Sequence, residues 1–300
     1  MPELPEVEAL AAFLRERAVG RVVARVDVPG IHVLKTYDPP PTALAGLEVT
    51  GAARHGKFLD LTVGGSGPGG DGGLHLVVHL ARAGWLHWRE SLPPAPPRMG
   101  KGPLGMRIHL ADPATGETAG GFDLTEQGTQ KRLAVYVVRE PAEVPGVARL
   151  GIDVLDPAFT VDALAGLLTG QRSQVKGLLT DQSVLAGVGN AYSDEVLWEV
   201  RMSPFKPASS LTDDDVARLH AALVGTIRDA VGRAEGLAAG KLKAEKKSGL
   251  NVHGRAGLPC PRCGDTVREV SFATKALQYC PTCQTGGKPL ADRRLSRLLR

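Results

Sequence analysis

The chain is poor in aromatic residues and has no long apolar run. Phe, Trp and Tyr make up 4% of its 300 residues, so a buried core must be built mainly from Leu, Val and Ala. No stretch of about 18 apolar residues is present, which excludes a membrane-spanning helix. The first residues include glutamates, where a signal peptide needs basic residues followed by an apolar run. These absences predict a globular cytoplasmic protein with no membrane association.

Charge is distributed unevenly along the chain. The net charge is +4, but the last 60 residues hold 13 Lys and Arg against 4 Asp and Glu, a net of +9, which leaves −5 for the other 240 residues. A basic end on an acidic remainder indicates contact with a polyanion. A solvated charged face would give the same count, so charge alone leaves both interpretations open.

The cysteines are few, and all four fall within 24 residues as two Cys-x-x-Cys pairs. Four thiolates at this spacing suit a tetrahedral Zn²⁺ ion. Two disulfides or a redox pair are the alternatives, although disulfides are rare in the cytosol and a redox motif needs only one pair. The short runs between the pairs, 266–270 and one ending at Tyr279, predict a zinc-ribbon hairpin with a loop at 272–275. Such a ribbon is either a structural element or a probe of a DNA groove. The predicted zinc ligands are Cys260, Cys263, Cys280 and Cys283.

Hydrophobic periodicity divides the chain into a β-rich first half and a helical second half. Leu4, Val7, Leu10 and Leu14 recur at helical spacing and predict an N-terminal helix. Beyond the two prolines at 141 and 145 the pattern becomes helical, and Thr212 with Asp215 forms a capping box that opens a long helix. Residues 236–250, rich in Gly and Lys, predict a mobile loop. The predicted strands are 21–28, 47–54, 57–63, 74–80, 106–110 and 133–138, and the other predicted helices are 161–168, 173–179 and 190–200.

The N-terminus offers a candidate nucleophile. A Met before Pro is normally removed, which would leave Pro2 with a free secondary amine; an α-amino group titrates near about 8, below a lysine. Such an amine can attack an aldehyde-level carbon and form a cationic iminium, with the neighbouring Glu3 as general acid and base. Taken alone, a Met-Pro-Glu start is a common accident, and a plain N-terminus is the simpler interpretation.

Four segments together resemble the formamidopyrimidine-DNA glycosylase/endonuclease VIII family. Each is weakly to moderately specific alone, but they agree with the family in order and spacing and span nearly the whole chain. They are Met1–Glu8, Arg54–Lys57, Leu185–Tyr192, and Val252–Arg255 followed by the four cysteines.

The resemblance implies a multidomain α+β fold. We expect an N-terminal catalytic β-sandwich with an N-terminal helix, a helical helix–two-turn–helix domain that binds DNA, and a zinc-ribbon finger. The expected boundaries are 1–138 for the sandwich, 139–150 for a linker, 151–250 for the helical domain, 251–290 for the finger and 291–300 for a basic tail.

The resemblance also implies roles for individual residues. Pro2 would attack C1′ of the deoxyribose, Glu3 would assist ring opening and proton transfer, and Glu6 would be a second carboxylate of the active site. Lys57 and Asn190 would bind phosphates, and Gly187 and Gly189 would let the backbone approach the DNA. For each of these residues a purely structural role is the competing interpretation: a helix-end acid, a solvated lysine or an ordinary turn glycine.

The chain departs from the family pattern at four places. Lys275 stands at the finger tip where the family usually has an arginine, which removes the bidentate fork for phosphate. Arg82 stands where a methionine fills the gap left by the flipped base, and it could equally face solvent. Lys131-Arg132-Leu133 replaces an Arg-Arg-Phe wedge, so Leu133 would enter the stack without aromatic stacking. The segment 236–243 is shorter than the loop that covers 8-oxoguanine in the guanine-specific branch.

These features together predict a bifunctional DNA glycosylase and abasic-site lyase of base-excision repair. We expect it to be monomeric, to hold one structural zinc, and to act on damaged double-stranded DNA of a bacterial nucleoid in the cytoplasm. The short 236–243 segment favours an endonuclease VIII-like range of oxidised pyrimidines and abasic sites. The alternative is a protein of the same fold that binds lesions or abasic sites with little or no base excision. A zinc-ribbon regulator would leave Pro2, Glu3 and Asn190 unexplained together.

Overall fold

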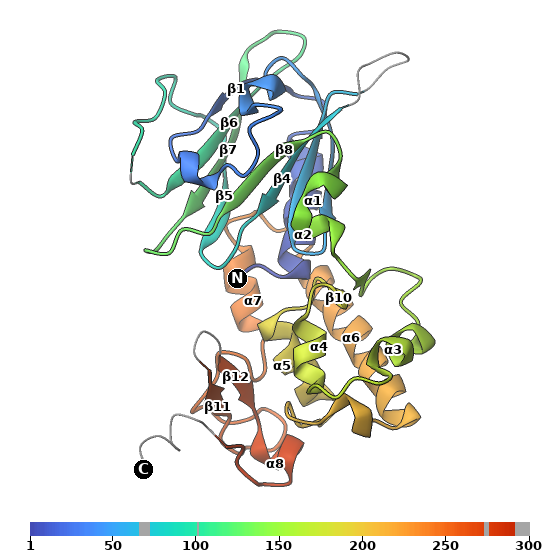
Figure 1. Cartoon of the computed structure of the whole chain (residues 1–300). Coiled ribbons are helices and arrows are strands. Elements are labelled where there is room, and N and C mark those ends of the chain that lie inside the picture. The colour runs from blue at the N-terminus through green and yellow to red at the C-terminus, as the bar shows by residue number, and fades with distance from the viewer. Residues whose placement is uncertain (66–72, 101, 273–275, 292–300) are drawn as a thin grey trace. The chain divides into compact units, whose positions relative to one another are not determined.

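The computed structural model describes residues 1–65, 73–100, 102–272 and 276–291 (Figure 1). The chain forms two compact units, each built from two stretches of sequence. The first unit contains Met1–Arg149 and Ala234–Lys243, and the second contains Leu150–Arg233 and Ala244–Arg300. Among the described residues, no helix combines the length and apolar character needed to cross a membrane.

The first unit opens with helix α1, and the spacing of the apolar residues predicted it correctly. Pro5 lies in the first turn, where its missing N–H leaves no hydrogen bond unmade, and Glu6 lies near the positive end of the helix dipole. The helix spans Leu4–Arg17, and its buried face includes Leu4, Val7, Leu10 and Leu14.

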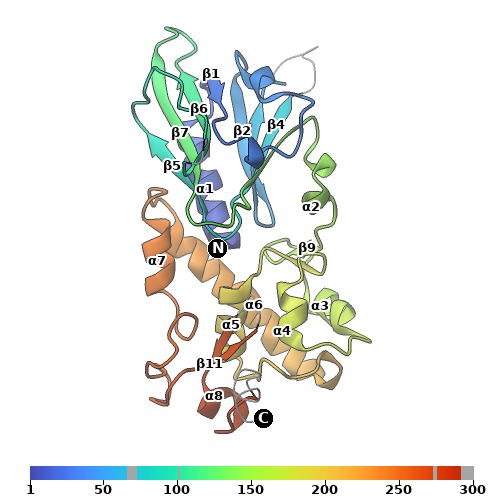
Figure 2. The same cartoon turned by 60° about the vertical axis from the view of Figure 1, so that its left-hand side comes forward.

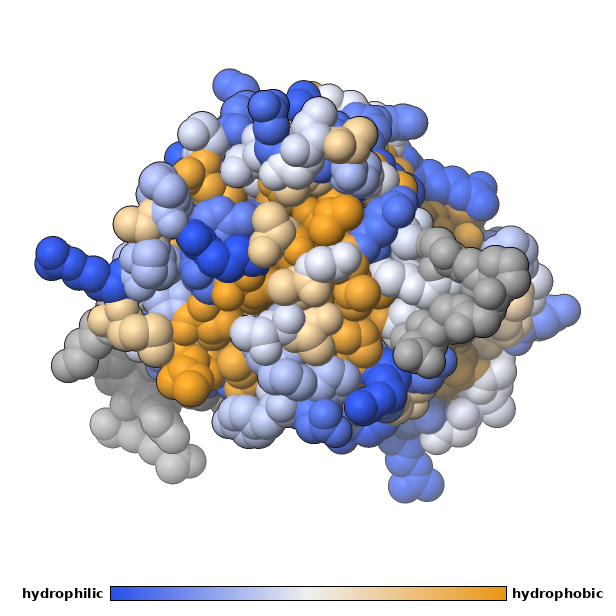
Figure 3. All heavy atoms as spheres, turned by 90° about the horizontal axis from the view of Figure 1, so that it is seen from above, coloured by the Kyte–Doolittle hydropathy of each residue, from blue (hydrophilic) through white to orange (hydrophobic). Residues whose placement is uncertain are grey.

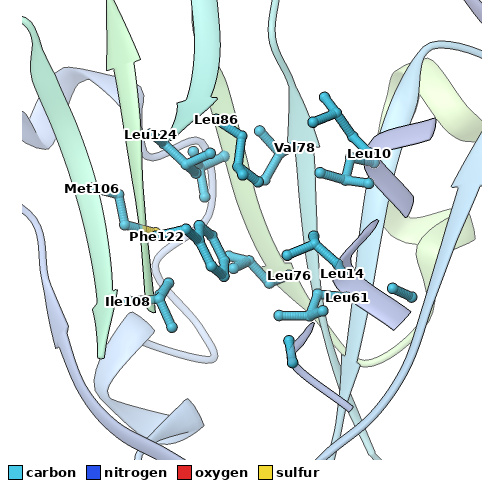
Figure 4. Close-up of a cluster of buried hydrophobic side chains, with 14 of the residues drawn as sticks. Leu10, Leu14, Leu61, Leu76, Val78, Leu86, Met106, Ile108, Phe122 and Leu124 are labelled. Carbon is cyan, nitrogen blue, oxygen red and sulfur yellow. The ribbon is translucent and has the colours of Figure 1, made fainter. Parts of the chain in front are cut away.

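Two four-stranded antiparallel sheets form a sandwich in this unit, with strand orders β1-β6-β7-β5 and β2-β3-β4-β8. Side chains from the two inner faces meet in one core, where Phe122 lies between the sheets and Leu10 and Leu14 enter from α1 (Figure 4). The strands are β1 (Val22–Asp27), β2 (Val49–His55), β3 (Phe58–Val63), β4 (Leu74–His79), β5 (Gly84–Arg89), β6 (Leu104–Ala111), β7 (Thr118–Glu126) and β8 (Ala134–Val138).

Strands β5 and β7 are absent from the predicted runs, whereas the other six strands match them. Strand β7 contains Gly120 and Gly121, two residues of low strand propensity. Packing requires Gly121, because a Cβ on it would lie 2.0 Å from the carbonyl oxygen of Ile108 in β6. The two glycines therefore resemble a turn in the sequence, whereas in the structure they let the backbone of the central strand β7 pack closely against β6.

The predicted loop at 236–250 is wrong over much of its length, because helix α7 (Leu242–Ser248) lies there. Leu242 is fully buried and joins Ala239 in the core of the first unit. The indole N–H of Trp85 donates to the carbonyl oxygen of Ala239 over 3.1 Å. Leu242, predicted to lie in a mobile loop, is thus buried in a core that forms only in the tertiary structure.

Short helical turns lie between or after the strands of the first unit. One face of this unit carries apolar surface. Seen from above, apolar residues gather near the middle of that face and hydrophilic ones surround them (Figure 3). Among the described residues of the unit, Ile31, Tyr37 and Met99 are the large hydrophobic side chains exposed by more than 60%. The short turns are η1 (Ile31–Val33), η2 (Pro41–Leu44), η3 (Pro141–Glu143) and α2 (Pro145–Ala148).

The second unit is helical and carries a small antiparallel hairpin (Figure 2). Its long helix α6 opens with the predicted capping box, in which the Asp215 N–H donates to Thr212 Oγ1 over 3.2 Å. The hairpin of β11 and β12 confirms the strands predicted between the cysteine pairs. The elements are β9 (Ile152–Asp153), α3 (Val161–Leu168), α4 (Val175–Thr180), β10 (Leu185–Ala186), α5 (Asn190–Glu199), η4 (Ala208–Ser210), α6 (Asp213–Ala234), β11 (Arg268–Ser271), β12 (Ala276–Tyr279) and α8 (Pro281–Thr285).

Candidate active site and zinc centre

The predicted nucleophile lies at the buried N-terminal end of α1. Pro2 is buried, and Glu3 and Glu6 are each 3% exposed. Glu3 is the N-cap residue, and its backbone N–H donates to Glu6 Oε2 over 2.8 Å. One of the two acids therefore fixes the backbone that carries the other. A nucleophile at residue 2 would have two carboxyl groups close in sequence and withdrawn from water.

Lys57 lies in the tight β2–β3 turn and is only 6% exposed, which is rare for a lysine. Gly56, with φ +53°, makes that turn possible. Burial and the Lys57 ammonium lower the pKa of His79, at the end of β4, to about 4. The structure therefore brings a buried cation and a neutral histidine together. The sequence did not single out His79, although it starts the segment that contains Arg82.

An ion-pair cluster fastens α1 to β2. Glu8 Oε2 accepts a hydrogen bond from Arg54 Nε over 2.8 Å, and Glu8 Oε1 accepts one from Arg15 over 3.1 Å. Arg15 also donates to the Ala52 carbonyl oxygen over 2.8 Å. The Arg54 side chain is 9% exposed. The helix bearing Pro2 and the hairpin bearing Lys57 are thus locked together by groups that sequence reasoning did not assign.

Arg82 is exposed in the tight turn between β4 and β5. Ala81 adopts a left-handed conformation there, with φ +53°, and the Gly84 N–H donates to the Leu80 carbonyl oxygen over 2.9 Å. A Cβ on Gly84 would lie 2.2 Å from that same oxygen. The turn therefore presents Arg82 on a sharply constrained backbone.

The residues predicted as a base-stack wedge divide into an exposed part and a buried part. Arg132 is exposed, but Leu133 is 1% exposed and belongs to the sandwich core. The buried carboxylate of Glu126 accepts the backbone N–H groups of both residues, over 2.7 and 3.0 Å. The Leu133 side chain thus fills the core beside β8, and its expected role as a wedge in the DNA stack stays a prediction.

The glycine-rich turn before α5 is held by one side chain. Gln182 accepts from the Gly187 N–H over 3.1 Å and donates to the Val188 carbonyl oxygen over 2.8 Å. Gly187 has φ +92°, and Gly189 is the N-cap residue of α5. Asn190 starts the helix and donates from Nδ2 to the Ala276 carbonyl oxygen in β12 over 2.6 Å. The predicted DNA-contact turn is thus built against the hairpin.

Two buried acids on α5, which sequence reasoning missed, bind the finger segment. Asp194 is fully buried and accepts from Lys176 Nζ over 2.7 Å, from His253 Nδ1 over 2.7 Å and from the Gln278 N–H over 3.1 Å. Glu195 accepts the backbone N–H groups of residues 251, 252 and 253 over 2.7 to 2.9 Å. The sequence offered little signal for them, because α5 also contains other polar residues, and burial of acidic groups, which is rare unless they are paired, is visible only in the structure.

The four cysteines form a site suited to zinc. Their sulfur atoms all lie within 4.8 Å of one another, and two of the Sγ–Sγ distances are 3.9 and 3.4 Å. A tetrahedral ion with Zn–S bonds of about 2.3 Å needs sulfur atoms about 3.8 Å apart, so the donor set fits. Burial raises the pKa of the Cys260 thiol, but N–H donors from Trp198, Arg262 and Cys263 outweigh burial and lower it to about 6. Cys260 therefore favours the thiolate form that zinc requires, whereas burial raises the pKa of the Cys280 and Cys283 thiols.

Two predicted DNA contacts fall largely outside the described residues. Lys275 at the finger tip is one, and residues 292–300 of the basic tail are the other.

Family models match three parts of the chain. The formamidopyrimidine-DNA glycosylase N-terminal domain matches residues 1–119, and the H2TH domain of the same glycosylase matches residues 150–239. A zinc finger found in Fpg and in IleRS matches residues 257–286. The three matches follow the order expected from the sequence.

Full-length relatives and solved structures agree with these matches. The formamidopyrimidine-DNA glycosylase of Moorella thermoacetica is 34% identical and the alignment covers 90% of this chain and 94% of the relative. An uncharacterized glycosylase-like protein of Mycobacterium tuberculosis is 57% identical over 53% of this chain and 99% of its own length. The MutM (Fpg) structure from Thermus thermophilus has a TM-score of 0.75 at 31% identity, covering 96% of this chain and 100% of that one. The Lactococcus lactis Fpg bound to DNA containing an abasic site shares the fold, with a TM-score of 0.77 at 23% identity and coverage of 94% and 99%. This chain belongs to the formamidopyrimidine-DNA glycosylase (Fpg/Nei) family of DNA-repair glycosylases.

Proposed function

We propose that this chain is a bifunctional DNA glycosylase and abasic-site lyase of base-excision repair, with the amine of Pro2 as nucleophile once Met1 is removed. The observation that carries the proposal is the N-terminal end of α1, where Pro2 directly precedes the buried carboxyl groups of Glu3 and Glu6. The two acids also form a capping box at the helix start, so the proposal rests on their burial next to residue 2. The proposed setting is nucleoid DNA of a bacterial cytoplasm.

The proposed reaction proceeds by covalent catalysis. The Pro2 nitrogen forms a bond to C1′ as the C1′–N bond to the damaged base breaks, and the base leaves with a proton. Glu3 donates a proton to O4′ as the C1′–O4′ bond opens, which leaves an iminium at C1′. Loss of a C2′ proton then expels the 3′-phosphate, and a second elimination expels the 5′-phosphate. Water hydrolyses the remaining imine and regenerates the amine.

The other predicted residues position the DNA. Lys57 binds a phosphate beside the flipped nucleotide, and Asn190 with the Gly187–Gly189 turn binds a second stretch of backbone. Arg82 and Arg132, both exposed, contact the opening left by the flipped base, where arginine can stack or donate hydrogen bonds. Lys275 supports the lesion phosphate from the finger tip. Flipping costs a few kcal/mol and least at damaged or mispaired bases, which favours lesions over normal DNA.

The favoured substrates are oxidised pyrimidines and abasic sites. The segment between α6 and α7 is short, and Ala239 within it is fixed by the Trp85 indole. A short, anchored segment does not provide a loop that folds over 8-oxoguanine. It therefore supports an endonuclease VIII-like range of substrates. A panel of duplexes with one oxidised pyrimidine, one 8-oxoguanine or one abasic site tests this range, and faster excision of 8-oxoguanine than of the pyrimidines would reverse it.

Borohydride trapping on a duplex with one abasic site tests the chemistry. Intact mass first establishes that Met1 is absent, and fluorescence anisotropy measures binding to the same duplex. Wild type should form a covalent adduct and cut the strand, whereas Pro2→Gly should bind with nearly the same Kd and form none. Glu3→Gln should lose base excision yet keep cleavage of preformed abasic sites. An adduct that persists in Pro2→Gly would place the nucleophile elsewhere.

A lesion-binding protein of the same fold is the second candidate function. The observation that favours it is Arg82 at the position of the gap-filling residue, together with the burial of Leu133 away from the DNA stack. Tight binding to abasic DNA with no adduct, in protein shown to lack Met1, would establish this function in place of the first.

A further inference from the structure

Trp198, in the last turn of α5, touches the zinc site directly. Trp198 is only 7% exposed, and its indole Nε1–H donates to Cys260 Sγ over 3.3 Å. The residue packs in a small cluster with Val252, Val267 and two of the cysteines, Cys260 and Cys280. An indole N–H is a donor only, and here a sulfur ligand is its acceptor.

Arg262, between the first two cysteines, fixes the orientation of this indole. Its guanidinium carbon lies 3.8 Å from the centre of the Trp198 ring. Its NH1 donates to the Trp198 carbonyl oxygen over 2.7 Å and its NH2 donates to Glu199 Oε2 over 2.7 Å. Arg262 thus contacts the end of α5 through the Trp198 ring, the Trp198 carbonyl oxygen and the Glu199 carboxylate. These contacts hold the indole with its N–H directed at Cys260 Sγ.

We propose that Trp198 is a positioning residue of the zinc centre, whose N–H orients and stabilises the Cys260 thiolate and so ties metal retention to helix α5. Four thiolates around one Zn²⁺ carry a net charge of −2, and an N–H donor to one sulfur offsets part of that charge. Hydrogen bonds of this kind to metal ligands typically change metal affinity 10- to 100-fold. Because α5 begins at Asn190 and carries Asp194 and Glu195, the same helix connects the metal to the finger segment and to the Gly187–Asn190 turn.

An isosteric replacement of Trp198 by benzothienylalanine tests this assignment. The sulfur analogue keeps the shape of the ring and removes only the N–H, so the cavity left by Trp198→Phe is avoided. The matched control is the same replacement at Trp85, which removes an indole N–H bonded to the Ala239 carbonyl oxygen in the first unit. Zinc release to the chromogenic chelator 4-(2-pyridylazo)resorcinol should become about 10-fold faster or more for the Trp198 replacement, and stay unchanged for the Trp85 replacement.

A spectroscopic readout separates a bond to sulfur from a general loosening. In protein loaded with Co²⁺, the sulfur-to-cobalt charge-transfer band should move to longer wavelength when the Trp198 N–H is removed, because the sulfur electrons are less stabilised. Arg262→Gln should give a smaller shift in the same direction. Unchanged zinc release and an unchanged band in the Trp198 replacement would overturn the proposal. Neither readout depends on the proposed DNA chemistry.

Discussion

His79 illustrates how a single residue acquires its properties from tertiary neighbours. Burial and the Lys57 ammonium lower its pKa to about 4, below the pKa of about 6.5 that it has in the unfolded chain. The unfolded chain therefore takes up the proton first, so stability should fall as pH drops from about 6.5 to about 4 and then level off. The loss should amount to about 3 kcal/mol, at about 1.4 kcal/mol for each pKa unit.

Replacing Lys57 by Met should raise the pKa of His79 and reduce that loss. An NMR titration of the His79 ring measures the pKa, and urea unfolding at pH 7 and pH 5 measures the stability. Lys35→Met, at an exposed position, is the control and should leave the titration unchanged. A wild-type His79 that titrates at its ordinary pKa would refute this account.

Residues near the chain start could be proposed as catalytic from sequence because their chemistry is local. Pro2 and Glu3 depend on position along the chain, and the cysteine ligands depend on spacing alone. Asp194 and His79 could not be assigned, because nothing local marks a carboxylate or an imidazole that becomes buried. Leu133 marks another limit, since a motif alignment does not tell that a leucine at a strand start is buried in a core.

At the scale of elements, the ion-pair cluster that joins α1 to β2 should affect the rate of strand cleavage more than the affinity for DNA. Glu8→Gln removes the negative charge and one of the two oxygens that accept from Arg54 and Arg15, and should cost about 1–3 kcal/mol of stability. A small displacement of Pro2 should slow single-turnover strand cleavage about 10-fold or more. Kd for abasic DNA should hardly change. Glu16→Gln, on an exposed position of the same helix, is the control, and equal slowing in both variants would contradict a positioning role.

Elements with a strong apolar period were predictable, and elements made by context were not. Helix α1 and six of the strands carry their pattern in the sequence, as does α6 with its Thr212–Asp215 box. Strand β7 is concealed by Gly120 and Gly121, whose role is to let two strands approach. Helix α7 is concealed by flanking glycines and lysines, because only Leu242 faces the core.

At the scale of the whole molecule, the sequence order of parts differs from their grouping in space. Residues 234–243 follow the long helix of the second unit but complete the core of the first. Only burial decides that grouping, because the local sequence mixes Ala and Leu with Gly and charged residues and shows no clear pattern. The finger differs, because spacing of its cysteines predicts both its hairpin and its metal.

Removing zinc should therefore have a graded effect across the chain. Without the metal the finger loses its main source of stability, and Asp194 and Glu195 lose partners in residues 251–253 and 278. Asp194 keeps Lys176, but Glu195 loses its three backbone donors; an uncompensated buried carboxylate costs about 3–5 kcal/mol, so α5 should loosen as well. Hydrogen exchange after chelation, with zinc loss verified by native mass spectrometry, should show lost protection in β11, β12 and α5, while β6 and β7 stay protected. DNA affinity should fall about 10-fold or more with the loss of the α5 turn. Exchange confined to the cysteine turns, with α5 unchanged, would show that the buried acids do not couple the metal to the helix.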